Sequence, residues 1–258
     1  MHISLEYLLG FFRILYKQKN PEMINLNLTG VLYLDIETAP QYKAYEELPE
    51  RMKPLWDKKF AGTFAAKDNP DKNSIDDYFD CNLYGEFCKI ICISVGIKIN
   101  DQELRIKSYY GHDEKKLLQE FVEMLNNSSV IKSLCAHNGK EFDFPLLCKR
   151  MIINGIKLPE LLQIAGKKPW EIFLLDTKEL WKFGSYRDSV SLDLLAAVLG
   201  LPSPKAEITG AEVAKAYWHE NRLEDIKNYC QRDTVTLANI ALKLTGQNAF
   251  TDENIVYA

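Results

Sequence analysis

Several features are scarce or missing in this sequence of 258 residues. No uncharged apolar run approaches the roughly 20 residues that a membrane-spanning helix needs, so we expect no membrane segment. Positive charge is not in excess, because 32 lysine and arginine residues stand against 36 aspartate and glutamate residues, a formal net charge of −4. The chain is therefore not a generally basic nucleic-acid coat, and any polyanion has to bind at a local patch.

The cysteines show no spacing that indicates disulfide bonds or a zinc site. The six cysteines are scattered through apolar segments of a chain that is too long to need disulfide staples. A zinc site requires cysteine or histidine pairs at short spacing, and Cys88 with Cys92 has no second pair nearby. The apolar stretch near the N-terminus is not followed by a small-residue cleavage site, which argues against a secretory signal peptide. We therefore expect buried, reduced thiols in a cytoplasmic protein.

The composition is that of a folded protein, because 47% hydrophobic and 26% charged residues are enough to fill a sizeable core. Apolar residues predict a first buried strand over 31–36, which stops at Pro40. Residues 41–87 show no sustained periodicity of apolar residues, and we interpret them as a long irregular insertion with short helices. We expect a single domain over 23–258, preceded by an extension at 1–22 that is either native or the result of a misassigned start codon.

Strand and helix patterns alternate after the insertion. Runs of β-branched residues predict strands, and apolar residues at steps of three and four predict helices. The predicted order is strands 89–99 and 103–110, helix 113–126, strand 130–136, a helix with Pro145 in its first turn, strand 172–175, and helices 191–199, 210–219 and 221–244. This order indicates an α/β fold in which helices flank a mixed β-sheet.

Two acidic residues lie in the first predicted strand. Asp35 and Glu37 share one face of that strand, because side chains alternate with a period of two. Two like charges so close to each other repel. One interpretation is a pair of buried acids that act together, and the other is a strand end at which both acids reach solvent. The pair alone is compatible with both interpretations.

A third acid lies where a charge is not expected. Asp233 falls inside the apolar stripe of the final predicted helix, so its carboxylate faces the core. An unpaired buried charge costs several kcal/mol or shifts its pKa, and it therefore requires a basic partner or a metal ion. Tyr229 precedes Asp233 by one helical turn and projects beside it, although an isolated tyrosine there would by default only pack the helix.

The fourth acid, Asp143, follows a strand and a loop, and on its own it would be a helix N-cap. Together, four carboxylates from separate elements are what a pair of hard divalent cations requires, because Mg²⁺ and Mn²⁺ favour oxygen ligands. Two such ions would neutralise the formal charge of −4. Two metals about 4 Å apart can activate a water molecule and stabilise the leaving oxygen of a phosphodiester.

Three short motifs carry these acids: DIET at 35–38, HNGKEFDFP at 137–145 and YCQRD at 229–233. They resemble the three exonuclease motifs of the DEDD superfamily, in the form that has tyrosine instead of histidine in the third motif. More closely, the chain resembles a stand-alone family related to the proofreading exonuclease domain of family-B DNA polymerases. This resemblance spans about residues 24–245 and includes KPWE at 168–171, LDTKELWKFG at 175–184, SLDLLAAVLGLPSPK at 191–205 and ITG at 208–210.

The resemblance implies a ribonuclease H-like fold, two bound Mg²⁺ or Mn²⁺ ions, and hydrolysis of DNA from its 3′ end to nucleoside 5′-monophosphates. It implies four metal ligands, one of which bridges both ions, and a tyrosine that orients the attacking water. These residues are Asp35 as the bridging ligand, Glu37, Asp143, Asp233 and Tyr229. The implied substrate contacts are Thr38 and Ala39 through backbone groups, Asn138 at the terminal nucleotide, and also Lys140 and Phe142.

The acids alone do not fix the substrate. A DNA exonuclease and an exoribonuclease act on the same phosphodiester, and a nucleic-acid-binding module without catalysis is a third interpretation. We expect single-stranded DNA rather than RNA as the partner, with a polymerase or repair protein acting in trans, and the sequence does not indicate an oligomeric state. Basic residues near the motifs, among them Lys132, Lys167 and Lys182, are candidates for phosphate contacts, and Trp170 and Phe144 for base stacking.

Overall fold

The structure is a computed structural model that describes residues 23–62, 73–187, 189–203 and 208–258, so the predicted extension at 1–22 lies outside the described residues. The elements in chain order, with η marking 3-10 helices, are β1 (Val31–Pro40), η1 (Tyr45–Glu47), α2 (Lys53–Ala61), η2 (Asp76–Leu83), β2 (Cys88–Asn100), β3 (Glu103–Tyr110), α4 (Glu114–Asn127), β4 (Ser133–Ala136), α5 (Asp143–Ile153), η3 (Glu160–Leu162), η4 (Pro169–Glu171), β5 (Leu175–Asp176), α6 (Thr177–Lys182), α7 (Leu192–Val198), η5 (Gly210–Glu212), α8 (Val213–Trp218), α9 (Leu223–Leu244), η6 (Asp252–Asn254) and β6 (Ile255–Tyr257). Of the helices in these ranges, none has the length and apolar character to cross a membrane.

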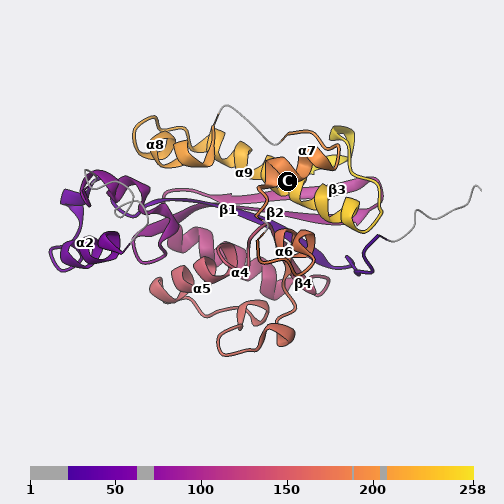
Figure 1. The fold of residues 1–258 in the computed structure, drawn as a ribbon, viewed down its shortest axis with the longest axis horizontal. Coiled ribbons are helices and arrows are strands. Elements are labelled where there is room, and N and C mark those ends of the chain that lie inside the picture. Colours follow the sequence, from indigo (N-terminus) through magenta and orange to yellow (C-terminus); the bar gives the residue numbers. More distant parts are fainter. Residues whose placement is uncertain (1–22, 63–72, 188, 204–207) are drawn as a thin grey trace, which may run out of the picture.

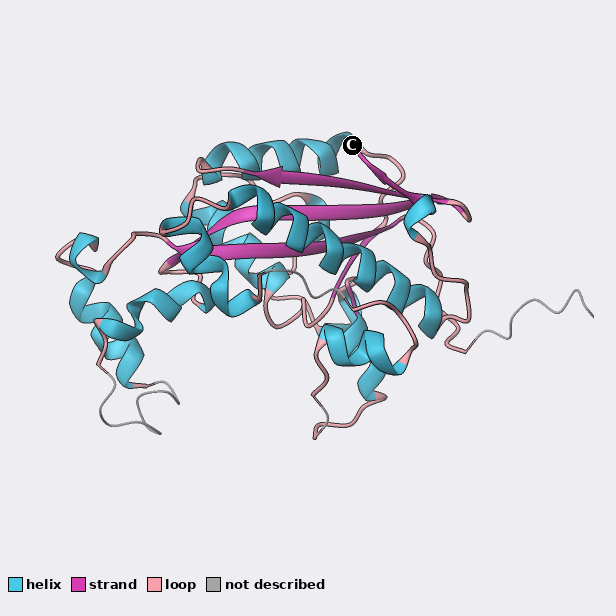
Figure 2. Ribbon diagram, turned by 90° about the horizontal axis from the view of Figure 1, so that it is seen from above, coloured by secondary structure: helices cyan, strands magenta, loops and turns pink. Residues whose placement is uncertain are grey.

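The strands form one mixed sheet in the order β5-β4-β1-β2-β3-β6. The pairs β1/β2 and β2/β3 are antiparallel, whereas β1/β4, β4/β5 and β3/β6 are parallel. Helices cover both faces of this sheet, with α7, α8 and α9 on one side and α4 and α5 on the other (Figures 1 and 2). The predicted α/β fold, a mixed sheet flanked by helices, is confirmed.

The alternation along β1 decides which side chains meet which helices. Leu32 and Leu34 belong to the core that includes residues of α4 and α5, whereas Val31 and Tyr33 pack with residues of α9. Because the period is two, Asp35 continues the face that is directed toward α9. Helix α9, which carries Asp233, therefore covers the face of β1 on which Asp35 and Glu37 lie.

Helix α9 approaches the sheet closely because β2 has a glycine beneath it. A Cβ atom on Gly96 would lie 2.8 Å from Ile106 Cδ1 and 3.2 Å from Thr234 Cγ2. The Thr234 hydroxyl in turn donates to the Ser94 carbonyl at 3.3 Å and to the carbonyl of Cys230 at 2.9 Å. This contact fixes the height of α9 above the strand that pairs with β1.

The insertion at 41–87 contains short helices, as predicted, and they are α2, η1 and η2. It has an apolar cluster of its own around Trp56, whose indole N–H donates to the Ser74 carbonyl at 2.6 Å. Figure 1 shows the insertion at one end of the sheet, next to the end of β1. The insertion therefore lies at the end of the strand that carries Asp35.

Several boundaries differ from the predicted ones. The first strand has its apolar pattern over 31–36 and stops at Pro40 as expected, but residues 37–40 are also paired with β2, and Pro40 is tolerated because the strand ends there. The predicted strand 172–175 begins only at Leu175. Helix α6 and strand β6 were not predicted. As a result, Asp35 lies inside a paired strand and not at a strand end open to solvent.

A buried ion pair joins the ends of several elements. Arg150 of α5 donates to both carboxylate oxygens of Glu114 in α4, at 2.8 and 2.7 Å. Glu114 also accepts from the Ile90 N–H and from the Asn154 amide, and Arg150 donates to the Gly85 carbonyl. The two side chains are only 2% and 8% exposed, so their charges are compensated by each other and by these hydrogen bonds.

We expect the Arg150→Met variant to lose about 3–5 kcal/mol of unfolding free energy, because Glu114 would remain as a buried charge without its partner. Denaturant unfolding measures this loss. The control is Lys116→Met, which breaks an exposed ion pair with Glu120 and should change stability by less than about 1 kcal/mol. Equal effects of the two substitutions would contradict this account of the buried pair.

Candidate metal centre

Two carboxylates of β1 and a thiol of α9 form the centre of the site. Asp35 and Glu37 each offer an oxygen, and Cys230 offers its sulfur, and these atoms all lie within 4.8 Å of one another. The Cys230 thiol donates a hydrogen bond of 3.3 Å to the Asp35 carbonyl. Burial raises the pKa of this thiol well above its usual value. Cys230 thus stays a neutral hydrogen-bond donor, and the charge at the centre comes from the carboxylates.

Helix α9 adds an acid and a phenol to the same place. The Asp233 side chain is 9% exposed, which agrees with its predicted position in the apolar stripe. Burial raises the pKa of Tyr229, and the charges of Asp233, Glu37 and Asp35 raise it further. The Tyr229 hydroxyl therefore lies among the three carboxylates and keeps its proton at neutral pH.

Asp143 reaches the site from the first turn of α5, where it is 4% exposed. Phe142 is the N-cap residue of this helix, so Asp143 does not cap it, contrary to the simplest reading of the sequence. Burial raises the Asp143 pKa to about 7, although hydrogen bonds with its own backbone and with the Ile36 backbone lower it in part. The start of α5 therefore lies near β1, the strand that carries Asp35.

The four acids are close enough to repel one another. Burial raises the pKa of Asp35 well above its usual value, and the charges of Asp233, Glu37 and Asp143 raise it further. Burial also raises the pKa of Glu37, with added repulsion from Asp233, Cys92 and Asp143. The Asp233 pKa is raised to about 7, again mainly by burial. The charges of Asp143 and Asp233 therefore act on Asp35 and Glu37, although the compact group of ligand atoms consists of Asp35, Glu37 and Cys230.

Two buried oxygens in this cluster lack a partner. Asp35 Oδ2 and Asp233 Oδ1 make no hydrogen bond with any part of the chain that the structure describes. A buried oxygen without a partner is unfavourable, and a cation that binds both oxygens would remove this penalty. The carboxylate donors are of the kind that Mg²⁺ and Mn²⁺ prefer. The residues present therefore fit divalent metal ions.

The loop after β4 is held by an acid that the sequence reasoning missed. Asp176 Oδ1 accepts from the backbone N–H groups of Asn138, Lys178 and Glu179, and its Oδ2 accepts from the Lys140 N–H, at 2.9–3.2 Å. Asn138 has a φ of 64°, a left-handed conformation that asparagine tolerates better than most residues. Asp176 thus caps α6 and at the same time fixes the loop that precedes Asp143.

The other predicted contact residues lie around this loop and the end of β1. The Thr38 hydroxyl donates to the Asn82 carbonyl at 2.8 Å, and Ala39 is buried as a whole residue, so neither side chain is open to a ligand. Lys140 pairs with Glu179 at 2.6 Å. Phe142 is half-buried and packs against the core. Their contacts with substrate stay predictions.

The proposed stacking residues differ from each other in exposure. Phe144 is fully buried, so the expectation that it stacks on bases is wrong; it lies one residue into α5, on the side that faces the core. Trp170 is 72% exposed and remains available for such a contact. His137 Nε2 donates to the Val190 carbonyl at 3.0 Å and Nδ1 shares a hydrogen bond of 2.9 Å with the Thr177 hydroxyl, a structural role consistent with its position at a strand end.

We expect Asp176→Asn to loosen the loop at 138–140 without removing a metal ligand. Asparagine has one acceptor oxygen and an NH₂ group, so the Lys140 N–H would face a donor in place of Oδ2. The loss should be about 1–3 kcal/mol of unfolding free energy, with a lower rate of catalysis and unchanged Mn²⁺ stoichiometry. Thermal unfolding and calorimetric Mn²⁺ titration measure these quantities. Loss of bound Mn²⁺ would instead make Asp176 part of the metal centre.

We expect Mn²⁺ affinity to rise as the pH increases through about 7, because metal binding has to displace protons from Asp143 and Asp233, whose pKa values are about 7. The stability of the metal-free fold is expected to change with pH in the opposite direction. Both pKa values are raised from 3.8, so this fold is most stable below about pH 4 with respect to these groups and loses that stability as the pH rises through 7. Calorimetric titrations at several pH values, each with a melting curve, test both trends. An affinity that does not change across this range would contradict the prediction.

Two comparisons relate the chain to known proteins. A sequence profile of the family described as "Predicted 3'-5' exonuclease related to the exonuclease domain of PolB" matches residues 82–251. Asp143, Tyr229 and Asp233 lie in the matched segment, whereas Asp35 and Glu37 precede it and join them through the fold. A solved structure with some similarity is the family B DNA polymerase from the hyperthermophilic archaeon Pyrobaculum calidifontis, at 15% identity and a TM-score of 0.48. The similarity covers 82% of this chain and 24% of that polymerase. No curated protein sequence matches the chain.

Proposed function

Because the chain belongs to the family of predicted 3′-5′ exonucleases related to the exonuclease domain of PolB, we propose that it hydrolyses single-stranded DNA and frayed 3′ ends to nucleoside 5′-monophosphates with two divalent metal ions. One observation carries this proposal. Four carboxylates from β1, α5 and α9 converge, and two of their buried oxygens lack a hydrogen-bond partner in the described part of the chain. Such a cluster supports metal-assisted phosphodiester hydrolysis.

Asp35, Glu37, Asp143 and Asp233 would hold the metal ions. The carboxylate of Asp35 is repelled by all three of the others, and in this proposal it would be a ligand shared by the two ions. When bound, the ions supply an activated water and stabilise the leaving oxygen of the phosphodiester. The carboxylates position this chemistry beside the end of β1.

Tyr229 would orient the attacking water through its hydroxyl. Its pKa is raised by burial and by the surrounding carboxylates, so it does not act as a base at neutral pH. A neutral hydroxyl can still hold a water molecule in line with a phosphate. A Cβ atom on Gly210 would lie 3.9 Å from this hydroxyl, so η5 lies next to it and a small residue there leaves it room.

The terminal nucleotide would lie between the end of β1 and the loop that Asp176 holds. The side chain of Asn138 would border this space, with Lys140 and Phe142 beside it and the backbone of Thr38 at the end of β1. We place the enzyme at 3′ ends in DNA repair, or in trans with a polymerase. Frayed or mismatched ends should be cut faster than paired ends, because a site for a single strand requires base pairs to melt first.

The experiment uses single-stranded DNA and RNA of the same sequence, labelled at either end, with Mn²⁺, with Mg²⁺ and with chelator. We expect the label at the 3′ end of DNA to be released first as a nucleoside 5′-monophosphate, and chelator to stop the reaction. First release of a 5′ label, or full activity in chelator, would overturn the proposal. If RNA were degraded faster than DNA, the exonuclease reaction would stand and the proposed substrate would change from DNA to RNA.

A further inference from the structure

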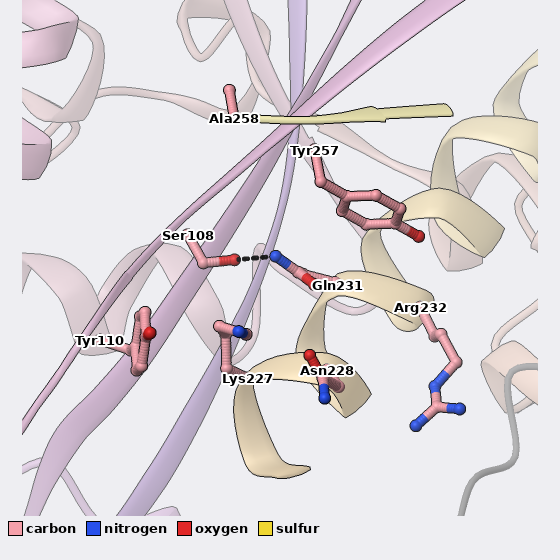
Figure 3. A pocket seen from close by; sticks show the side chains of 8 residues that line it. All are labelled: Ser108, Tyr110, Lys227, Asn228, Gln231, Arg232, Tyr257 and Ala258. Atoms are coloured by element: carbon pink, nitrogen blue, oxygen red, sulfur yellow. Dashed lines mark hydrogen bonds between the residues drawn. The ribbon is translucent and has the colours of Figure 1, made fainter. Parts of the chain in front are cut away.

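A hollow lies on the side of α9 that faces away from the carboxylates. It has a volume of about 590 Å³ and lies between α9, the end of β3 and the C-terminal strand β6 (Figure 3). Its lining consists of Ser108, Tyr110, Lys227, Asn228, Gln231, Arg232, Tyr257 and Ala258. The helix positions 227, 228 and 231 lie on a different side of α9 from 229 and 233, because each residue turns the helix by about 100°. The proposed metal ligands are therefore not part of this lining.

Arg232 is the free cation of this region. It is exposed, and it makes no ion pair with any residue in the described ranges. Lys227, the other cation, is held by Glu224 at 2.5 Å and lies 5.2 Å from the centre of the Tyr110 ring. Arg232 is thus the side chain in this hollow whose charge an external anion could neutralise.

The hollow continues along α9 beyond Arg232. A neighbouring hollow of about 550 Å³ shares Arg232 and Tyr257 with the first and extends past Lys243 to the turn after α7. Arg232 therefore stands where the two hollows meet. The cationic side chains of the combined lining are Lys227, which pairs with Glu224, together with Arg232 and Lys243, and its acidic side chain is Asp252.

The polar groups of the first hollow are already held in place. The Gln231 amide donates to the Ser108 hydroxyl at 3.0 Å, which Figure 3 shows as a dashed line. The Tyr110 hydroxyl donates to Glu224 at 2.7 Å. Side chains that are ordered before binding lose less entropy when a ligand arrives. Tyr110 and Tyr257 remain 39% and 56% exposed, so parts of both rings are open to a ligand.

We propose that the two hollows form a groove that binds single-stranded nucleic acid, with a backbone phosphate on Arg232 and bases against Tyr257 and Tyr110. Each hollow has the size of a small-ligand site. A cation in one groove with exposed aromatic rings is the combination that binds single strands with little base preference. The inference rests on the proposed function, since the bound strand would be the part of the substrate that lies outside the active site.

Binding is measured by fluorescence anisotropy with a labelled oligothymidylate of about eight nucleotides, in chelator and at several salt concentrations. Chelator prevents cleavage, and it removes any influence that Arg232 exerts on metals through the neighbouring Asp233. The variants are Arg232→Glu and Tyr257→Ala. The control is Lys116→Glu, the same charge reversal on α4 at the opposite face of the sheet, where the lysine is 73% exposed.

We expect Arg232→Glu to raise the Kd on the order of tenfold and to reduce the slope of log Kd against log salt by about 0.7, the value for one lost phosphate contact on a single strand. Tyr257→Ala should weaken binding without changing that slope, and Lys116→Glu should change neither. The proposal of a strand-binding groove would be overturned if Arg232→Glu left the Kd and the slope unchanged. It would also be overturned if thymidine 5′-monophosphate alone bound tightly at Arg232.

The two proposals fail separately. If the protein degrades DNA and Arg232→Glu leaves strand binding unchanged, the groove is refuted and the exonuclease stands. If strand binding depends on Arg232 but DNA and RNA both stay intact with Mn²⁺, the proposed function is refuted and the groove stands.

Discussion

Replacing Asp233 with asparagine is expected to abolish turnover and to weaken Mn²⁺ binding together. The substitution keeps the shape of a side chain that is only 9% exposed, so the fold should persist. It removes one negative ligand from a site whose affinity for divalent ions depends on charge. A metal centre supplies several kcal/mol of transition-state stabilisation, so the rate should fall by at least about a thousandfold.

The matched control for this variant is Asp225→Asn, the same change on the same helix. Asp225 is partly exposed and pairs with Arg222 at 2.7 Å, an interaction worth little at a surface. It should keep wild-type turnover and metal binding. Single-turnover cleavage of a 3′-labelled strand and calorimetric Mn²⁺ titration measure both properties. An Asp233→Asn enzyme that binds two Mn²⁺ ions with unchanged affinity would remove this residue from the metal centre.

Replacing Tyr229 with phenylalanine is expected to lower turnover by roughly ten- to a thousandfold while metal binding survives. The change keeps the ring that packs beside Asp233 and removes one hydroxyl. If that hydroxyl positions the attacking water, the loss is one oriented hydrogen bond of about 1.5–4 kcal/mol in the transition state. Because Tyr229 stays protonated among the carboxylates, its removal does not change the charge at the metal site.

Tyr217→Phe is the control for Tyr229→Phe, because it removes a tyrosine hydroxyl from the neighbouring helix α8. That hydroxyl bonds His112 at 2.9 Å, so its loss should affect stability slightly and turnover not at all. Wild-type turnover by Tyr229→Phe would exclude the tyrosine from the mechanism. A parallel loss of metal binding would mean that Tyr229 is structural and holds the helix that carries Asp233.

The acids were predictable because local periodicity determines where they point. Asp35 and Glu37 share a face through the period of two, and the apolar stripe of the last helix places Asp233 against the sheet. These patterns depend only on neighbouring residues, and the structure keeps them. The role of Asp143 followed only from the resemblance of its motif, because on its own it was expected to cap the helix; its burial depends on how α5 packs against the sheet.

The parts that could not be predicted depend on contacts between distant residues. Asp176 resembles an ordinary helix cap, and its bonds to Asn138 and Lys140 span 38 and 36 positions of the sequence. Strand β6 has only three residues and forms because it pairs with Leu104–Ile106 of β3. The sulfur of Cys230 reaches the carboxylates because α9 lies close to β1, which the spacing of cysteines does not reveal.

The measurement that tests the two-metal centre most directly is a Mn²⁺ titration in which bound ions and cleavage rate are followed in the same sample. We predict two ions per chain in the wild type, with hydrolysis of the 3′-terminal nucleotide appearing as the second site fills. Asp35→Asn, which removes the proposed bridging ligand, should bind fewer ions and lose cleavage with them. Full cleavage with one ion bound, or two tightly bound ions in Asp35→Asn with unchanged cleavage, would contradict the assignment of these carboxylates.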